Sequence, residues 1–312
     1  MSPKVIGIGE VLWDLLPTGP QLGGAPANFA YHAHALGAHA RVVTRVGNDN
    51  YGREIRQRFE ELGIADGTVQ VDDSLSTGTV TVALTERGIP NYIIHENVAW
   101  DHLVVTPAAL QAVREADAIC FGSLAQRNKV SKASIQRLVL AAPESALRVF
   151  DINLRQKYFS HEVIEQSLRT ANVLKLNDSE LPILSNQYNL VGSVRQQVEQ
   201  LAKKFNLKLV ALTRGSAGSL LFQNGKWSDC PSVPIAIVDT IGAGDAFTAA
   251  LVLGLLRKLD LDEINFLADE VARHVCSCAG ATPPLPKSLR NRFEIRSSAS
   301  QPASEPAGTL NA

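Results

Sequence analysis

The chain has 312 residues, 45% of them hydrophobic and 20% charged, which is ordinary for a globular protein with a large core. The formal net charge is −1 and the sequence pI is about 6.7, so no overall field favours nucleic acid or an anionic membrane as a partner. The first residues lack the layout of a signal peptide, and no stretch approaches the roughly 20 apolar residues of a membrane span. We therefore expect a cytoplasmic protein.

The first third of the chain alternates between predicted strands and helices. Residues 4–17 and 40–47 are typical of strands, and residues 23–37 and 51–63 are typical of helices that end at Gly37 and Gly63. Residues 77–96 differ, because they alternate by twos around a Gly-Ile-Pro turn, as in a hairpin. We expect this hairpin to join residues near 11–22 in a small β lid beside the main domain.

The rest of the chain repeats the order of strand and helix. Strands are predicted within 116–124, 147–155, 171–180 and 207–215, helices at 132–142, 194–206 and 246–258, and a hairpin around Asn224-Gly225. Repeated units of this kind predict an α/β fold with a doubly wound, mostly parallel sheet. The tail at 297–312 is rich in Ser, Ala and Pro, and we expect it to be disordered.

The four cysteines give no sign of a metal or redox site. Cys120, Cys230, Cys276 and Cys278 form no CxxC pair and have no histidine at ligand spacing. They are expected to be packed or free thiols. His32, His34 and His39 are likewise interpreted as surface or helix-face residues rather than metal ligands.

Polar residues follow several predicted strands. Ligands of open α/β sheets bind at the carboxyl ends of the strands, where these residues would meet along one edge. They are Asp14, Gly23-Gly24, Asp151, Asn153, Arg155, Lys175, Asn177, Glu180, Thr213, Arg214, Gly215 and the stretch from Asp239 to Asp245.

The stretch VDTIGAGDAFTAALVLGLL, residues 238–256, places a glycine turn before a long apolar helix. Such a turn allows close approach of a ligand, and the helix start offers free amides to a phosphate. Asp245 in this first turn could accept a proton from a hydroxyl that attacks phosphorus, or it could simply cap the helix. The chain has no Walker loop, no dinucleotide fingerprint and no G-x-S-x-G elbow, so the glycine turn is the remaining candidate for handling phosphate.

The segment DTIGAGDAF (239–247), together with GGAPANFAYHAHALG (23–37), resembles the paired signatures of the ribokinase-like, or PfkB-type, carbohydrate kinases. The resemblance extends to about residue 290. It implies one Rossmann-like kinase domain at 1–296, with a lid built from about 11–22 and 77–98. It also implies phosphoryl transfer from ATP to a sugar hydroxyl with Mg²⁺.

The resemblance further implies a role for each matching residue. Asp245 would be the catalytic base, with the amides of Gly242, Ala243 and Gly244 as anion hole. Asp14, Gly24 and Asn28 would hold the sugar, and we add Arg155 as a substrate or phosphate contact. Nucleotide contacts would come from Lys175, Asn177, Thr213, Arg214, Gly215 and Gly280, with Glu180 orienting Mg²⁺ indirectly. Asp239 and Ile241 match a loop that in many members holds a monovalent cation, usually K⁺.

Within this family, the segments GEVLWDLLP, GGAPANFA, TGTVTVAL and AWDHL are most similar to bacterial fructokinases. Ala25 stands where ribokinases and adenosine kinases commonly have Asn. A 2-keto-3-deoxygluconate kinase stays open, since Arg155, Tyr92 and His95 could serve an acid group. A sugar- or nucleotide-binding regulator without turnover is the non-enzymatic alternative.

Three further expectations concern the surroundings of this site. Asn28 is expected to line the pocket because its neighbours are apolar. Trp13 and Trp100 flank the lid, where each is either core or a face for the sugar. The alternating hairpin has an apolar face that predicts a homodimer.

Overall fold

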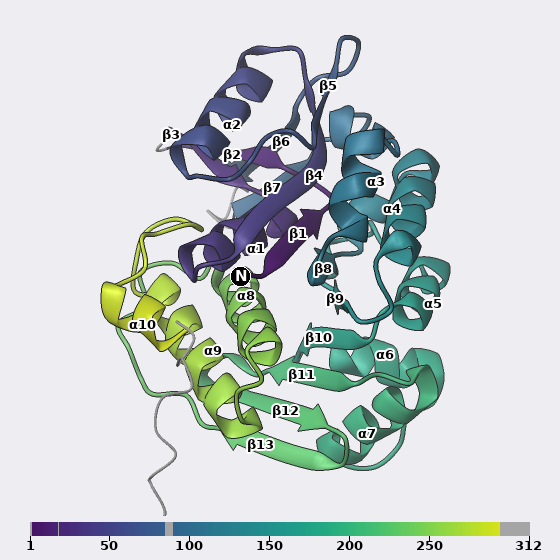
Figure 1. Ribbon diagram of the computed structural model, residues 1–312, viewed down its shortest axis with the longest axis vertical. Helices are drawn as coiled ribbons and strands as arrows, with labels where there is room; N and C mark the ends of the chain where they lie inside the picture. The colour runs from purple at the N-terminus through teal and green to yellow at the C-terminus, as the bar shows by residue number, and fades with distance from the viewer. Residues whose placement is uncertain (1, 18, 85–89, 294–312) are drawn as a thin grey trace, which may run out of the picture.

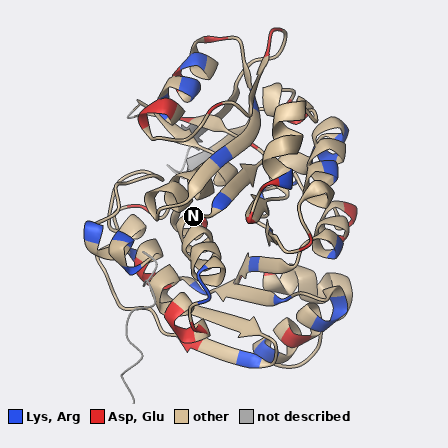
Figure 2. Ribbon diagram, in the orientation of Figure 1, with Lys and Arg blue, Asp and Glu red and all other residues tan. Residues whose placement is uncertain are grey.

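The computed structural model describes residues 2–17, 19–84 and 90–293 (Figure 1). The predicted tail at 297–312 and the Gly-Ile turn of the hairpin lie outside this range. Within it, no helix is long and apolar enough to cross a bilayer. Basic and acidic residues are interspersed along the chain, as Figure 2 shows, in keeping with the small net charge.

The main sheet of the described chain has nine strands in the order β13-β12-β11-β10-β9-β8-β1-β4-β5. The strands from β11 to β5 pair in parallel, and β12 and β13 extend one edge as antiparallel strands. Their bounds are β1 (Lys4–Ile8), β4 (His39–Gly47), β5 (Val69–Asp72), β8 (Ala118–Phe121), β9 (Leu147–Asp151), β10 (Val173–Asn177), β11 (Leu209–Thr213), β12 (Ser219–Gln223) and β13 (Lys226–Cys230).

Helices cover both faces of this sheet. One face packs against α1 (Ala25–Ala35), α2 (Asn50–Glu61), α8 (Ala243–Leu256), α9 (Leu261–Cys276) and α10 (Lys287–Arg292). The other packs against α3 (Pro107–Arg114), α4 (Lys129–Ala141), α5 (His161–Thr170), α6 (Leu181–Tyr188) and α7 (Val194–Phe205). Short 3₁₀ turns lie at Ala99–His102, Leu124–Gln126 and Gly215–Ala217.

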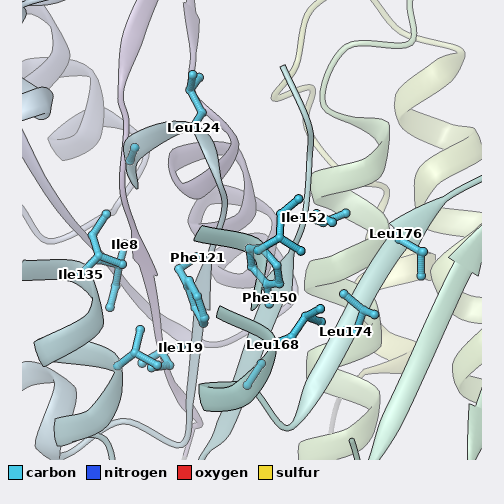
Figure 3. Packing of buried hydrophobic residues seen from close by; sticks show 14 of the residues in the cluster. Ile8, Ile119, Phe121, Leu124, Ile135, Phe150, Ile152, Leu168, Leu174 and Leu176 are labelled. Atoms are coloured by element: carbon cyan, nitrogen blue, oxygen red, sulfur yellow. The ribbon is translucent and has the colours of Figure 1, made fainter. Parts of the chain in front are cut away.

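Side chains alternate across a sheet, so successive residues of a strand pack in the hydrophobic cores on opposite faces. Val149 belongs to the core that includes residues of α1 and α8, and its neighbour Phe150 belongs to the core on the other face, which Figure 3 shows. There the ring of Phe150 stacks on Phe121, with 5.3 Å between centroids. Helix α8 is buried from Ala246 to Gly254 between α1 and α9, which explains why it is apolar all round.

A second sheet of four strands, which we call the lid sheet, lies beside the main sheet. Its order is β3 (Gly19–Gly23), β2 (Leu12–Leu16), β6 (Gly78–Leu84) and β7 (Pro90–Ile94). β2 pairs in parallel with β6, and the other two pairings are antiparallel. The predicted fold class, a mostly parallel doubly wound sheet with a small β lid, is confirmed.

The sequence analysis missed β5 and the helices α3, α5, α6, α9 and α10. Several of these helices carry start signals: the side chains of Thr106 and Ser160 cap α3 and α5, accepting the amides of Ala109 and Val163. β5 is a four-residue edge strand with only two apolar–polar repeats, too short for periodicity to reveal.

Candidate active site

A cleft of about 630 Å³ lies between the lid sheet and the carboxyl ends of the parallel strands. Its lid wall includes Leu12, Asp14, Leu16, Val80, Tyr92 and Ile94. Its main-sheet wall includes Glu10, Gly24, Asn28, Asn153, Arg155, Lys175, Asn177, Thr213, Ile241, Gly242, Gly244 and Asp245. The cleft therefore gathers residues that are up to 235 positions apart in the sequence, from Glu10 to Asp245.

Asp245 opens onto this cleft from the first turn of α8. Asn28, only 4% exposed, donates its side-chain amide to Asp245 Oδ2 at 2.8 Å. Burial, and next the charge of Asp151, raise the pKa of Asp245 to about 7, while Asn28 and the nearby cations act against that rise. A carboxylate with this pKa can both take up and release a proton near neutral pH.

The glycine turn before Asp245 is tightly constrained. Gly242 precedes α8 with a φ of 78°, and a Cβ there would lie 2.4 Å from the carbonyl oxygen of Ala281. Only glycine fits a position with both a left-handed backbone and no room for a side chain. The turn points the start of α8, with its unpaired first-turn amides, into the cleft. The Ala243 amide is directed instead to the Thr240 carbonyl, at 3.3 Å.

Beneath this turn lies a buried ion pair. Lys175, 6% exposed, contacts Asp151 with 3.1 Å between Nζ and Oδ1, and Thr248 donates to the other oxygen of Asp151 at 2.9 Å. A Cβ on Gly244 would approach Lys175 Nζ to 3.0 Å. Burial opposes the charge of Lys175, but the carboxylates of Asp151, Glu180 and Asp245 outweigh it and raise its pKa. The carboxylate of Asp151 is thus bound on both oxygens, by Lys175 and by Thr248.

Three carboxyl groups surround the side of the cleft next to the lid. Burial raises the pKa of Glu10 to about 7 and that of Asp14 to about 6. Arg155 acts in the opposite direction on both, and on Asp245. Glu10 is 2% exposed, and its Oε2 has no hydrogen-bond partner among the described residues.

Glu10 was missed by the sequence analysis. The available signal was an acid directly after the Gly9 turn, inside the apolar run 5–13. The backbone of Glu10 packs closely against Gly24, since a Cβ at Gly24 would lie 2.6 Å from the carbonyl oxygen of Glu10.

The expected nucleotide residues divide into two groups. Lys175, Asn177 and Thr213 line the cleft. Arg214 instead forms an ion pair with Asp229 at 2.7 Å, and Gly215 begins a 3₁₀ turn outside the cleft lining. Gly280 borders a different cleft, of about 740 Å³, between β3, α2 and residues 278–284.

The carboxylates expected near metal ions are engaged by backbone amides. Glu180 is buried and accepts the amides of Leu154 at 2.9 Å and Asn177 at 2.8 Å. Asp239 accepts the amides of Ile241 at 3.0 Å and Gly280 at 3.2 Å. Among the described residues, no three His, Cys, Asp or Glu side chains are grouped as a metal site.

The structure also decides between the two alternatives for the tryptophans and corrects the expectation for one histidine. Trp100 is buried beneath Gly78, where a Cβ would lie 2.2 Å from Nε1, and Trp13 borders the second cleft rather than the first. His32 is wholly buried, not a surface residue; His34 is half-buried and His39 exposed. The Asn28 side chain lines the cleft as expected.

Taken together, a buried carboxylate at a helix start, a glycine turn and a lid beside a doubly wound sheet define a group-transfer site of the kind that handles phosphate. The sequence profile of the pfkB family carbohydrate kinases matches residues 19–288. The chain belongs to this family and is a phosphotransferase with a sugar acceptor.

Individual relatives agree with this placement. A fructokinase of Salmonella typhimurium is 30% identical over 267 residues, covering 82% of this chain and 85% of that protein. A fructokinase of Klebsiella pneumoniae is 29% identical, covering 87% and 91%. The crystal structure of an uncharacterized sugar kinase from Pyrococcus horikoshii has a TM-score of 0.78 at 27% identity, covering 93% of this chain and 97% of that one. The same protein has been solved in complex with ATP.

Proposed function

We propose that the protein is an ATP-dependent fructokinase, which transfers the γ-phosphoryl group of ATP to the 6-hydroxyl of D-fructose. The observation that carries the proposal is Asp245, a carboxylate with a raised pKa at the start of α8, held by Asn28. The fructokinase names of the two bacterial relatives, and the ATP bound by the Pyrococcus protein, support the choice of acceptor and donor.

In the proposed reaction Asp245 accepts the proton of the sugar hydroxyl as its oxygen attacks the γ-phosphorus. The new O–P bond forms as the bond from phosphorus to the β-phosphate bridging oxygen breaks, and ADP leaves. The amides at the glycine turn, with the positive end of the α8 dipole, would hold the charge on the transferred oxygens. Lys175 adds a buried positive charge directly beneath Gly244.

Mg²⁺ would supply charge neutralisation of the phosphates when it is bound. Such ions are usually held by phosphate oxygens, waters and one or two carboxylates. Because two amides already engage Glu180, this residue fits only the indirect role that we assign to it, acting through water. Asp239 and Ile241 would hold K⁺ through oxygen lone pairs that the described contacts leave available, and K⁺ would increase turnover.

The charges on the side of the cleft next to the lid, where we place the sugar, favour a neutral sugar over a sugar acid. Glu10, Asp14 and Asp245 are carboxyls, and Arg155 is the cation that faces all three. His95, considered for binding an acid group, instead contacts Thr81 with 2.7 Å between Nε2 and Oγ1. A substrate carboxylate would therefore meet more negative than positive charge at this end of the cleft.

The test is a coupled assay of ADP release with fructose, 2-keto-3-deoxygluconate, ribose, tagatose and adenosine, each with and without K⁺. Fructose should give the highest kcat/KM, and K⁺ should raise it. A preference for 2-keto-3-deoxygluconate would contradict the proposed acceptor. Binding of sugar and ATP without release of ADP would favour the regulator.

We also propose that the protein is a homodimer that pairs through the lid sheet. Ile93 on the edge strand β7 is 46% exposed and lies on the face opposite to the cleft-lining Tyr92, which supports an apolar contact there. Light scattering at micromolar concentration should give twice the chain mass of 33.6 kDa. A mass of one chain would contradict the dimer.

A further inference from the structure

Helix α1 directs two buried polar side chains toward the C-terminal half of the molecule. Asn28 and His32 are four residues apart, so they lie one above the other on the same side of the helix. Asn28 donates to Asp245 Oδ2, and His32 Nε2 donates to the carbonyl oxygen of Ala281 at 2.9 Å. One face of α1 therefore contacts both the carboxylate of α8 and the backbone of residues 278–284.

The carbonyl that His32 holds is the one that contacts the glycine turn. A Cβ on Gly242 would lie 2.4 Å from Ala281 O and 2.8 Å from Ala281 Cα. Such close backbone packing means that a shift of Ala281 displaces Gly242 or opens a gap behind it. The position of the turn thus depends on where the Ala281 carbonyl is held.

The burial and protonation of His32 are those of a side chain that makes one fixed hydrogen bond. Its side chain is wholly buried, and burial lowers its pKa to about 4, so the ring is neutral at pH 7. A carbonyl can only accept, so the single ring proton is on Nε2. Nδ1 has no partner among the described residues, and the Ala281 bond is thus the polar contact that orients the ring.

We propose that His32 is a positioning residue for phosphoryl transfer, which fixes the glycine turn through Ala281 and ties it, through α1, to the carboxylate held by Asn28. The inference rests on the proposed role of this turn in binding the transferred phosphate. Asp239 and His274 hold the same loop elsewhere, at the Gly280 amide and at the Pro284 carbonyl, 3.0 Å from His274 Nε2. His32 differs from them because its bond lies directly behind Gly242.

The test compares three substitutions at one site. His32→Leu keeps an apolar volume without a donor, His32→Asn keeps an amide but is too short to reach, and His32→Gln keeps a donor at a similar reach. We expect kcat of the Leu and Asn variants to fall about 10- to 100-fold, because small misplacements of reacting groups have effects of this size. The sugar KM should change by less than about 3-fold and His32→Gln should retain most of kcat, since ground-state binding and the donor remain.

A second readout needs no sugar. Hydrogen exchange at the amides of Ala243 and Ala246, which donate to the carbonyls of Thr240 and Gly242, should be faster in His32→Leu and His32→Asn than in His32→Gln when followed by mass spectrometry. His274→Leu is the matched control, since it removes a histidine–carbonyl bond from the same loop away from Gly242. It should leave kcat within about 3-fold of wild type.

Each result decides the inference. Wild-type kcat in a folded Leu or Asn variant, or equal losses in the Asn and Gln variants, would overturn it. So would a loss in His274→Leu as large as that in His32→Leu. All variants are assayed with whichever sugar the wild-type protein phosphorylates. Failure of the fructose proposal would therefore appear in the wild type, and failure of this inference in the comparison of variants.

Discussion

The two walls of the cleft are built differently. The wall from the main sheet is buried and connected: Asn28 holds Asp245, and Lys175, Asp151 and Thr248 form a continuous network beneath the glycine turn. On the lid wall, Asp14 is half-buried and its carboxylate accepts no hydrogen bond from a described residue, and Tyr92 is 45% exposed. In the proposed mechanism the hydrogen-bonded wall carries the chemistry, while the lid wall mainly holds the sugar.

The largest effect on catalysis is expected from Asp245→Asn, which tests whether the main-sheet wall carries the general base. Removing a general base typically lowers kcat by about 10²–10⁴-fold. Since Asn fits the same space, the affinity for sugar, measured by calorimetry, should stay within about 3-fold. A kcat close to wild type would show that the main-sheet wall does not carry the base.

Lys175→Met should have the largest effect on folding. It leaves Asp151 as a buried charge without its cation, and such losses destabilise by about 3–5 kcal/mol. Urea unfolding measures the free energy. The control is Asp151→Asn combined with Lys175→Met, which should cost less than Lys175→Met alone; a larger cost would mean that the pair is not the origin of the effect.

Glu10→Gln tests the burial of the main-sheet wall through the pH dependence of folding stability. Because the folded pKa of Glu10 is raised from 4.5 to about 7, the folded state keeps a proton that the unfolded chain loses. The carboxyl therefore costs stability increasingly as pH rises from about 4.5 to 7, up to about 3 kcal/mol. The variant should gain Tm over wild type at pH 8 but little at pH 5, and an equal gain at both would contradict the assignment.

The smallest effect is expected on the lid wall. Asp14→Ala removes a carboxylate that we assign to a sugar hydroxyl, and one such hydrogen bond contributes about 1.5–3 kcal/mol. The sugar KM should rise about 10-fold or more with kcat within about 3-fold, as steady-state kinetics would show. A fall in kcat as large as that of Asp245→Asn would remove the distinction between the two walls.

The sequence predicted the fold because buried strands, helix ends and the period-two hairpin leave local signals. The glycine turn and Asp245 were equally visible, since a conformational need for glycine marks the chain directly. Glu10 and His32 were not, because their importance comes from burial and from partners far along the chain, such as Ala281, 249 positions from His32. For Arg214 the expected position in the cleft is not observed. The residue follows a strand as expected, but its side chain forms an ion pair with Asp229 instead of lining the cleft.

The most direct test of the account is the pH dependence of phosphoryl transfer in single turnovers of the wild type and Asp245→Asn. If Asp245 is the base, the wild-type rate should rise with pH through about 7, where its carboxyl loses its proton, and then level off. In Asp245→Asn the rate should be low and should lack this rise. A rise of the same size and midpoint in both proteins would contradict the account, since another group would then be the one that titrates.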